Sequence, residues 1–263
     1  MPELRMVSMR IFQLIVIVLL GLENASGDAI DSAEMTAHEL LTSAMDLQSG
    51  VVTSYTEAIM VVHRPDWERT SHMVVWTRGR EDVLIRFTAP AKDAGNATLK
   101  LAEKMWTFTS KLNRSIRLPY SLMSQSWGGS DFSYNDLSRT DILLHEYDLS
   151  IVERNQVDGH TVYVIEAIPH ENAPVVWGKE VLVIRDDFVL LKQTFYDQDF
   201  EPLKVMETTE IKELGGRVFG TKLRMVKLEA PESYTEFHTL KAEFDLELDD
   251  RLFTLFSLQS GAR

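Results

Sequence analysis

One short stretch of the sequence, Gly128-Gly129-Ser130-Asp131, resembles the motif around a catalytic nucleophile. A serine hydrolase elbow needs a second glycine two residues after the serine, so that the chain turns sharply and exposes the hydroxyl. Phe132 occupies that position. We therefore interpret the stretch as structural. Its two glycines permit unusual backbone angles, and we expect Ser130 or Asp131 to cap a short helix that begins near Phe132.

The seven histidines and the acidic clusters predict no metal site. No histidine lies in an H-x-x-x-H or H-E-x-x-H pattern. We expect His145 and Glu146 to be neighbours on a strand, where their side chains would point to opposite faces. The acidic residues between positions 245 and 250 lack the ligand order of a calcium loop, and Asp186-Asp187 is typical of a turn. There is also no glycine-rich phosphate loop. We expect no catalytic residue, no metal and no cofactor.

The N-terminal segment, residues 1–27, has the composition of a secretory signal peptide. Two arginines precede an apolar run over residues 11–22, and Ala25-Ser26-Gly27 supplies the small residues that signal peptidase requires. The run is shorter than the roughly 20 apolar residues of a membrane span; an uncleaved anchor is the alternative interpretation. We expect a mature chain that begins near Asp28, forms a single domain over 28–263 and works in the periplasm of a Gram-negative bacterium.

The composition restricts the partners of the protein. A formal net charge of −13 offers no basic surface for nucleic acid and is repelled by anionic membranes. The chain has no cysteine, which excludes thiol catalysis and leaves core packing alone to hold an exported fold together. Twelve Phe, eleven Met and five Trp supply apolar bulk, and methionine is an adaptable wall for irregular apolar ligands.

The elements that must position these residues are one helix followed by many strands. Residues 31–48 have apolar side chains at helical spacing, with Asp31 or Ser32 as a cap and Gly50 as a stop. After Gly50 the apolar period changes to two, and Asp158-Gly159 is a strong type I′ hairpin signal. The predicted strand segments are 51–62, 69–78, 83–88, 99–101, 105–108, 116–118, 150–154, 161–168, 180–184, 189–196, 204–211, 217–228 and 235–246.

Residues 119–139 interrupt the strand pattern with Pro, Ser, Gly and Asp, and predict a lid-like excursion with one or two short helical turns. Residues 249–258 predict a final helical turn. Ten or more successive strands, with few helices, indicate one large antiparallel sheet, which must curl, split or close. An outer-membrane barrel is the competing all-β interpretation, but charged residues interrupt the lipid-facing band that it needs.

Several distinctive blocks occur in the same order and spacing as in one known family. The most specific runs from Gly129 to Leu137 and reads G-S-D-F-x-x-x-D-L. The other blocks are 64–69, 75–76, 87–99, 105–106, 113–119 and 175–179. Together they resemble the bacterial outer membrane lipoprotein-sorting protein family, part of the periplasmic lipoprotein-carrier superfamily typified by LolA and LolB. The resemblance covers essentially all of the mature chain. Thr107–Ser110 and Gly128 depart from the family pattern, at positions expected to shape the cavity mouth.

The resemblance implies a mainly β fold: an unclosed antiparallel β-barrel of about eleven strands, with an N-terminal helix, a short helical lid and a hydrophobic cavity that takes acyl chains. It also implies a monomeric, non-enzymatic protein whose partners are an acylated lipoprotein or lipid and an inner-membrane exporter of the ABC or RND type. Strand alternation selects the expected cavity-lining residues, and an error of one residue in register would exchange the faces. They are Met60, Val62, Met73, Val75, Ile85, Phe87, Trp106 and Phe108, with Trp127, Gly129, Ser130, Asp131 and Phe132 at the lid and mouth.

Three functional hypotheses follow. The first is a periplasmic carrier that shields acyl chains between the inner and the outer membrane. Burial of an acyl chain is worth about 0.8 kcal/mol per methylene, so a lipid does not cross the aqueous periplasm at a useful rate unless a protein shields it. The second is a sensor on the same fold that detects lipids or mislocalised lipoproteins. The third is a hydrolase that uses Ser130 and a distant histidine.

Overall fold

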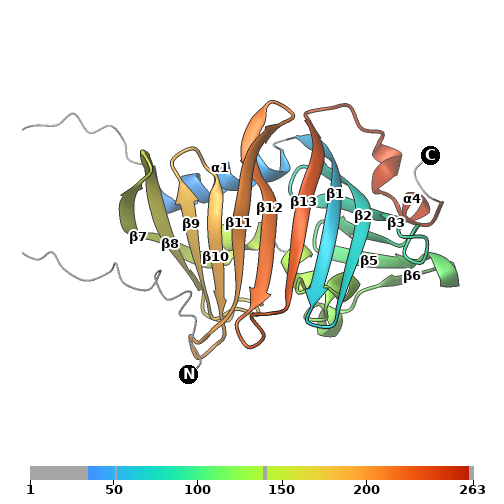
Figure 1. Ribbon diagram of the computed structural model, residues 1–263, viewed down its shortest axis with the longest axis horizontal. Coiled ribbons are helices and arrows are strands. Elements are labelled where there is room, and N and C mark those ends of the chain that lie inside the picture. The colour runs from blue at the N-terminus through green and yellow to red at the C-terminus, as the bar shows by residue number, and fades with distance from the viewer. Residues whose placement is uncertain (1–34, 51, 139–140, 261–263) are drawn as a thin grey trace, which may run out of the picture. The chain divides into compact units, whose positions relative to one another are not determined.

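The computed structural model describes residues 35–50, 52–138 and 141–260 (Figure 1). The predicted signal peptide, and the predicted start of the mature chain near Asp28, lie outside these residues. Among the described residues, no helix has both the length and the apolar character needed to span a membrane.

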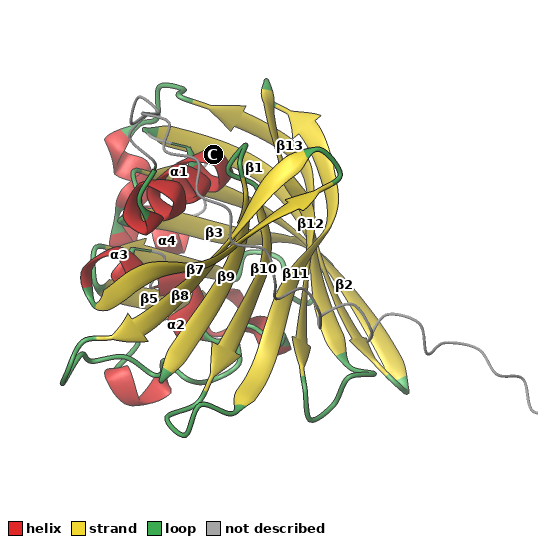
Figure 2. Cartoon of the chain, turned by 90° about the vertical axis from the view of Figure 1, so that its left-hand side faces the viewer, coloured by secondary structure: helices red, strands yellow, loops and turns green. Residues whose placement is uncertain are grey.

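One curved antiparallel sheet of thirteen strands dominates the fold (Figures 1 and 2). Its order is β6-β5-β4-β3-β2-β1-β13-β12-β11-β10-β9-β8-β7, so β6 and β7 are the two edges and the sheet does not close. The strands are β1 (Thr53–Arg64), β2 (Trp67–Arg78), β3 (Asp82–Ala89), β4 (Ala97–Leu101), β5 (Lys104–Thr109), β6 (Arg114–Arg117), β7 (Tyr147–Val157), β8 (His160–Pro169), β9 (Lys179–Arg185), β10 (Leu190–Tyr196), β11 (Pro202–Leu214), β12 (Arg217–Lys227) and β13 (Tyr234–Phe244).

The mainly β, unclosed and antiparallel architecture agrees with expectation, but the count of about eleven strands is too low. Each of the thirteen segments that alternation selects overlaps one observed strand. The alternation supports the expected ten or more strands, because each strand of a half-buried sheet shows its own period of two, whereas the figure of about eleven comes from the resemblance. The Asp158-Gly159 turn is confirmed: both residues have positive φ, 52° and 83°, as a type I′ turn between β7 and β8 requires.

The predicted N-terminal helix is α1 (Ala37–Ser49). Thr36 caps it, because its hydroxyl accepts from the Glu39 N–H while the Glu39 carboxylate accepts from the Thr36 N–H in a capping box. The helix therefore begins later than expected, and Asp31 and Ser32 lie outside the described residues. Gly50 ends it with a φ of 83°, as predicted.

The excursion between β6 and β7 contains more helix than expected. It holds η2 (Tyr120–Leu122), η3 (Trp127–Gly129), α2 (Tyr134–Ser138) and α3 (Ile142–His145). His145 therefore ends a helix and Glu146 is its C-cap, so the expectation that the two are neighbours on a strand is wrong. The remaining short helices are η1 (Ser110–Leu112), and η4 (Asp250–Phe253) with α4 (Leu255–Ser260), two helices where a single final turn was predicted.

The predicted cap of the helix in the Gly129–Leu137 block is wrong. Ser133, rather than Ser130 or Asp131, caps α2: the Asp136 N–H donates to the Ser133 Oγ, and the Ser133 N–H donates to the Asp136 Oδ2 at 2.7 Å. This S-x-x-D pairing satisfies two backbone donors at once and starts the helix at Tyr134.

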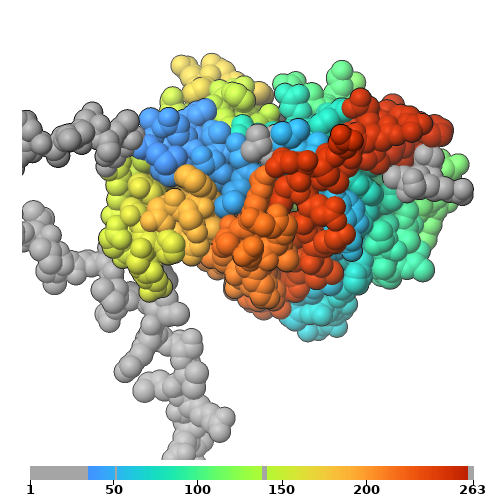
Figure 3. All heavy atoms as spheres, turned by 90° about the horizontal axis from the view of Figure 1, so that it is seen from above, coloured from blue at the N-terminus to red at the C-terminus, as the bar shows by residue number. Residues whose placement is uncertain are grey.

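The helices lie on the inner side of the curved sheet (Figure 2). Helix α1 packs on β7, β9 and β12, whereas α4 packs on β4 and β6. Seen from above, α1 and the C-terminal segment occupy opposite ends of the molecule (Figure 3). The two ends of the sheet therefore have separate cores, one under α1 and one under α4.

Candidate ligand cavity

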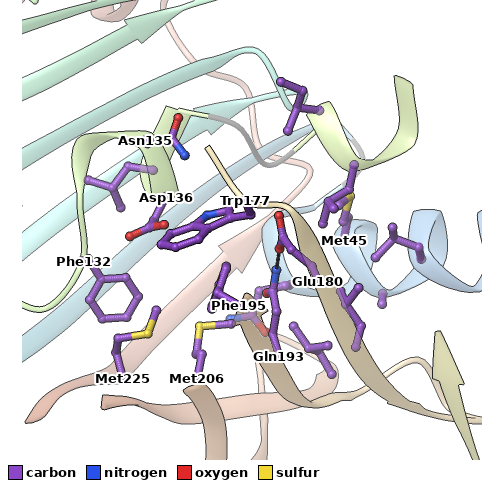
Figure 4. Close-up of a pocket in the computed structure, with 18 of the residues that line it drawn as sticks. Met45, Phe132, Asn135, Asp136, Trp177, Glu180, Gln193, Phe195, Met206 and Met225 are labelled. Atoms are coloured by element: carbon purple, nitrogen blue, oxygen red, sulfur yellow. Dashed lines mark hydrogen bonds between the residues drawn. The ribbon is translucent and has the colours of Figure 1, made fainter. Parts of the chain in front are cut away.

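An apolar cavity of about 260 Å³ lies beneath α1 (Figure 4). Residues of α1, α2, α3 and of strands β9 to β12 line it, together with the segment before β9. Three methionines, Met45, Met206 and Met225, form part of the wall. Their unbranched, polarisable side chains adapt to irregular apolar shapes, so the cavity suits a flexible hydrocarbon.

The local sequence explains how these side chains reach the cavity. Leu41, Ala44, Met45 and Gln48 follow the i, i+3, i+4, i+7 spacing of one helix face. On the sheet, residues two apart share a face, so β9 contributes Glu180 with Leu182, β10 Gln193 with Phe195, and β12 Leu223 with Met225.

Polar residues also line the cavity, among them the bonded pair Glu180 and Gln193, and Asp136, whose partner Lys204 is not itself a lining residue. Gln193 Nε2 donates to Glu180 Oε2 at 2.6 Å, and Lys204 Nζ donates to Asp136 Oδ2 at 2.6 Å. The Asp136 and Lys204 side chains are each only 6% exposed. Figure 4 shows Asp136 on one side of the Trp177 ring and the Glu180–Gln193 pair on the other.

Burial changes the acidity of both clusters. It raises the pKa of Glu180 to about 7, because the charged carboxylate is desolvated and the neighbouring Asp136 charge opposes ionisation. Burial also lowers the pKa of Lys204, against the opposing attraction of Asp136. The Lys204 ammonium lies 4.6 Å from the centres of the Trp177 and Phe195 rings, which adds cation–π contacts to the ion pair.

A wider and more polar cleft of about 1060 Å³ borders the cavity, since Ile142 lines both. Its walls include Lys104, Arg117, His145 and Glu146. An amphiphile in the apolar cavity would thus have polar surroundings within reach past Ile142.

The eight predicted cavity-lining residues lie in the other half of the sheet, on β1, β2, β3 and β5. Met60 and Val62 are fully buried, and they pack with Met73, Ile85 and Phe87 against Trp127. Val75 contacts the same cluster, whereas Trp106 and Phe108 pack with Phe253 and Leu258 near the C-terminus. None of the eight is among the residues that line the cavity beneath α1, and their contact with a ligand stays a prediction.

The predicted lid and mouth residues are built into the fold. Trp127 is buried and its Nε1–H donates to Thr98 Oγ1 at 3.0 Å. Gly129 has a φ of 71°, in the left-handed region that favours glycine. The buried Ser130 hydroxyl donates to the Trp127 carbonyl oxygen at 2.7 Å.

Asp131 and Phe132 complete this set. Asp131 forms a bidentate ion pair with Arg64, both bonds at 3.0 Å, and accepts from the Thr235 hydroxyl. Phe132 lines the cavity. Of the predicted site residues, Phe132 alone therefore borders the cavity beneath α1.

Sequence reasoning missed Asp136, Trp177, Glu180, Gln193 and Lys204. One signal for them was present: Glu180 shares its strand face with Leu182 and Ile184, and an acidic residue on a buried face indicates a polar function or partner. Trp177 and Asp136 also lie inside blocks that carry the family resemblance.

A metal-compatible arrangement of side chains occurs elsewhere. Ligand atoms of His160, Asp186 and Asp187 lie within 4.8 Å of one another. His160 Nδ1 is 2.6 Å from Asp186 Oδ1, and Arg185 donates to both oxygens of Asp187. These protein contacts account for the cluster as part of a turn, which agrees with the interpretation of Asp186-Asp187.

The unclosed antiparallel sheet and its helices form a fold that this chain shares with a LolA superfamily protein of known structure. A family model whose description reads "Uncharacterized protein" matches residues 79–260, and the chain belongs to that family. No curated protein matches the chain in sequence.

Three solved structures share the fold over nearly their whole length. A DUF1329 family protein from Desulfovibrio piger is 23% identical with a TM-score of 0.75, covering 84% of this chain and 97% of its own. A putative outer membrane lipoprotein-sorting protein domain from Vibrio parahaemolyticus is 22% identical with a TM-score of 0.73, covering 85% and 99%. A LolA superfamily protein from Nitrosomonas europaea is 20% identical with a TM-score of 0.70, covering 84% and 98%.

Proposed function

We propose that this protein is a periplasmic carrier that shields the acyl chains of a lipoprotein or lipid during transfer from the inner to the outer membrane. The observation that carries the proposal is the apolar cavity beneath α1 in a fold shared with a putative lipoprotein-sorting domain. The protein binds its cargo without transforming it. An inner-membrane exporter of the ABC or RND type supplies the cargo.

The size and walls of the cavity support a carrier that holds part of one chain. An engineered apolar cavity of about 150 Å³ binds benzene, so the roughly 260 Å³ here accommodates a short length of hydrocarbon. A longer chain requires the wall to yield. The three wall methionines suit such adjustment, and loose packing also favours release at the destination.

Native mass spectrometry with lipid extraction, on protein purified from the periplasm after mild lysis, tests the proposal. We expect a lipid or an acylated protein to co-purify, because the apolar wall is covered only when cargo is bound. Empty protein that also refuses added lipids would contradict a carrier.

A variant that fills the cavity identifies the binding site. Ala44 is 5% exposed and lines the cavity from α1. We expect Ala44→Phe to reduce the bound lipid by about tenfold or more, while overpacking costs about 1–3 kcal/mol of stability. Ala91→Phe, at an exposed alanine away from the cavity, is the control. An unchanged lipid load in Ala44→Phe, with circular dichroism showing a folded protein, would place the cargo elsewhere.

A further inference from the structure

The side chains that line the cavity include two carboxyl groups beside neutral polar ones. Asp136 and Glu180 present carboxyl groups in a mostly apolar wall, which also holds the neutral polar residues Gln48, Ser49, Asn135, Tyr147 and Gln193. Of the described residues that line the cavity, none is a lysine, arginine or histidine. Lys204 is bonded to Asp136 and is not among the lining residues.

The protein satisfies Glu180, which bonds to Gln193 and Tyr147, but it satisfies Asp136 only in part. Asp136 Oδ2 accepts from Ser133 and from Lys204. Asp136 Oδ1 is buried and, among the described residues, has no hydrogen-bond partner. A buried acceptor without a donor is costly, so this wall disfavours a further acceptor or an anion and favours a group that donates.

We infer that the cavity selects amphiphiles whose polar group donates hydrogen bonds and bears no negative charge, such as an alcohol or an ammonium group, and rejects anionic ones. The inference rests on the proposed carrier function and names the chemical class of the cargo group that enters the cavity. An anion placed beside Asp136 and Glu180 would be both desolvated and repelled, whereas a donor meets acceptors.

Because Glu180 titrates, the selectivity against anions should depend on pH. The groups that face Glu180 are Gln193, Asp136, Lys204 and Tyr147, and burial raises its pKa to about 7. Above that pH the carboxylate repels anions and attracts ammonium groups. Below that pH the carboxyl group is protonated and neutral, so it repels anions and attracts ammonium groups less strongly. Discrimination against anions therefore weakens as the pH falls.

A series of ligands with the same chain and different polar groups tests the inference. Dodecylamine, 1-dodecanol and dodecanoate are titrated into the purified protein by calorimetry at pH 8, each below its aggregation concentration. We expect the amine and the alcohol to bind at least about tenfold more tightly than dodecanoate, because a hydrogen bond to a charged group is worth that much.

The variant Glu180→Gln removes the charge and keeps the shape. We expect it to reduce the preference for dodecylamine over dodecanoate by about tenfold, with 1-dodecanol little affected. The matched control is Glu207→Gln on β11, whose side chain is 51% exposed and pairs with Lys192 outside the cavity. The wild-type series decides the question even if Glu180→Gln does not fold.

The outcomes separate this inference from the carrier proposal. If dodecanoate binds as tightly as the amine and the alcohol, the selectivity is overturned while the carrier proposal stands. If the preference in Glu180→Gln equals that of the wild type, Glu180 is not its source and the inference fails. If none of the three ligands binds, the proposed function fails together with it.

Discussion

Glu180 links the cavity to the stability of the whole fold. Its folded pKa of about 7 lies well above the ordinary value of 4.5. Between these two pH values the folded protein keeps a proton that the unfolded chain has released. The contribution of Glu180 to stability is therefore fully present below about pH 4.5, is lost as the pH rises towards about 7, and changes no further above it.

Glu180→Gln should remove this pH dependence. We expect the difference in the free energy of unfolding between variant and wild type to shift by about 3 kcal/mol in favour of the variant between pH 4.5 and pH 8, since each pKa unit is worth about 1.4 kcal/mol. Urea denaturation of both proteins at the two pH values measures it. Parallel stabilities across this range would show that Glu180 is solvated in solution.

The buried Asp136–Lys204 ion pair should also contribute measurably to stability. Both side chains are nearly inaccessible, so Lys204→Met would leave a buried carboxylate without its cation. We expect a loss of about 3–5 kcal/mol in unfolding free energy. Adding Asp136→Asn should recover much of that loss, because the uncompensated charge is gone. Simple additivity of the two single-variant effects in a double-mutant cycle would argue against direct coupling.

Trp127 ties the excursion between β6 and β7 to the sheet. Its ring lies 5.3 Å from that of Phe87 and 6.0 Å from that of Phe237, centre to centre, and its indole N–H bonds to Thr98. Arg69 donates to the neighbouring Gly128 carbonyl oxygen. The Trp127 side chain packs against Met60 and Phe87, and so occupies the space where the predicted cavity would lie.

Trp127→Ala should empty that space. We expect a loss of about 3–5 kcal/mol in stability, as for other large-to-small core changes. We also expect a new site for an apolar fluorescent probe against Met60 and Phe87. Phe253→Ala, in the separate cluster under α4, is the control for general loosening. Destabilisation without added probe binding would mean that the space collapses and that these residues serve packing alone.

At the scale of strands and helices, the alternation of apolar residues predicts where strands lie but not where a cavity lies. Met60 on β1 and Leu182 on β9 are both essentially inaccessible and both follow a period of two. Alternation therefore identified the strands, and in β1 also the face that is buried. It does not tell what lies opposite a buried face: Trp127 fills the space before Met60, whereas the small Ala44 and the flexible Met45 leave a cavity before Leu182. That difference arises from residues distant in sequence.

The whole molecule consists of two sheet halves joined where β1 pairs with β13. The chain runs outward from β1 to the edge β6, crosses through the short helices to the other edge at β7, and returns to β13. The crossing segment supplies both Trp127, which packs in one half, and Asp136, which lines the cavity in the other. A movement of this segment would affect both halves together.

Charge is the property of the whole chain that bears most on cargo transfer. If the protein is the carrier proposed above, its net charge of −13 causes repulsion from anionic bilayers. We expect protein loaded with a fluorescent lipid to deliver it more slowly to vesicles with about a third anionic lipid than to neutral ones. Raising the salt from about 0.05 M to 0.5 M should remove most of this difference, because screening shortens the range of repulsion below about 10 Å. Stopped-flow dequenching measures the rates, and neutral vesicles at both salt concentrations are the control. Faster delivery to the anionic vesicles at low salt would mean that a local basic surface, rather than the overall charge, governs contact with the membrane.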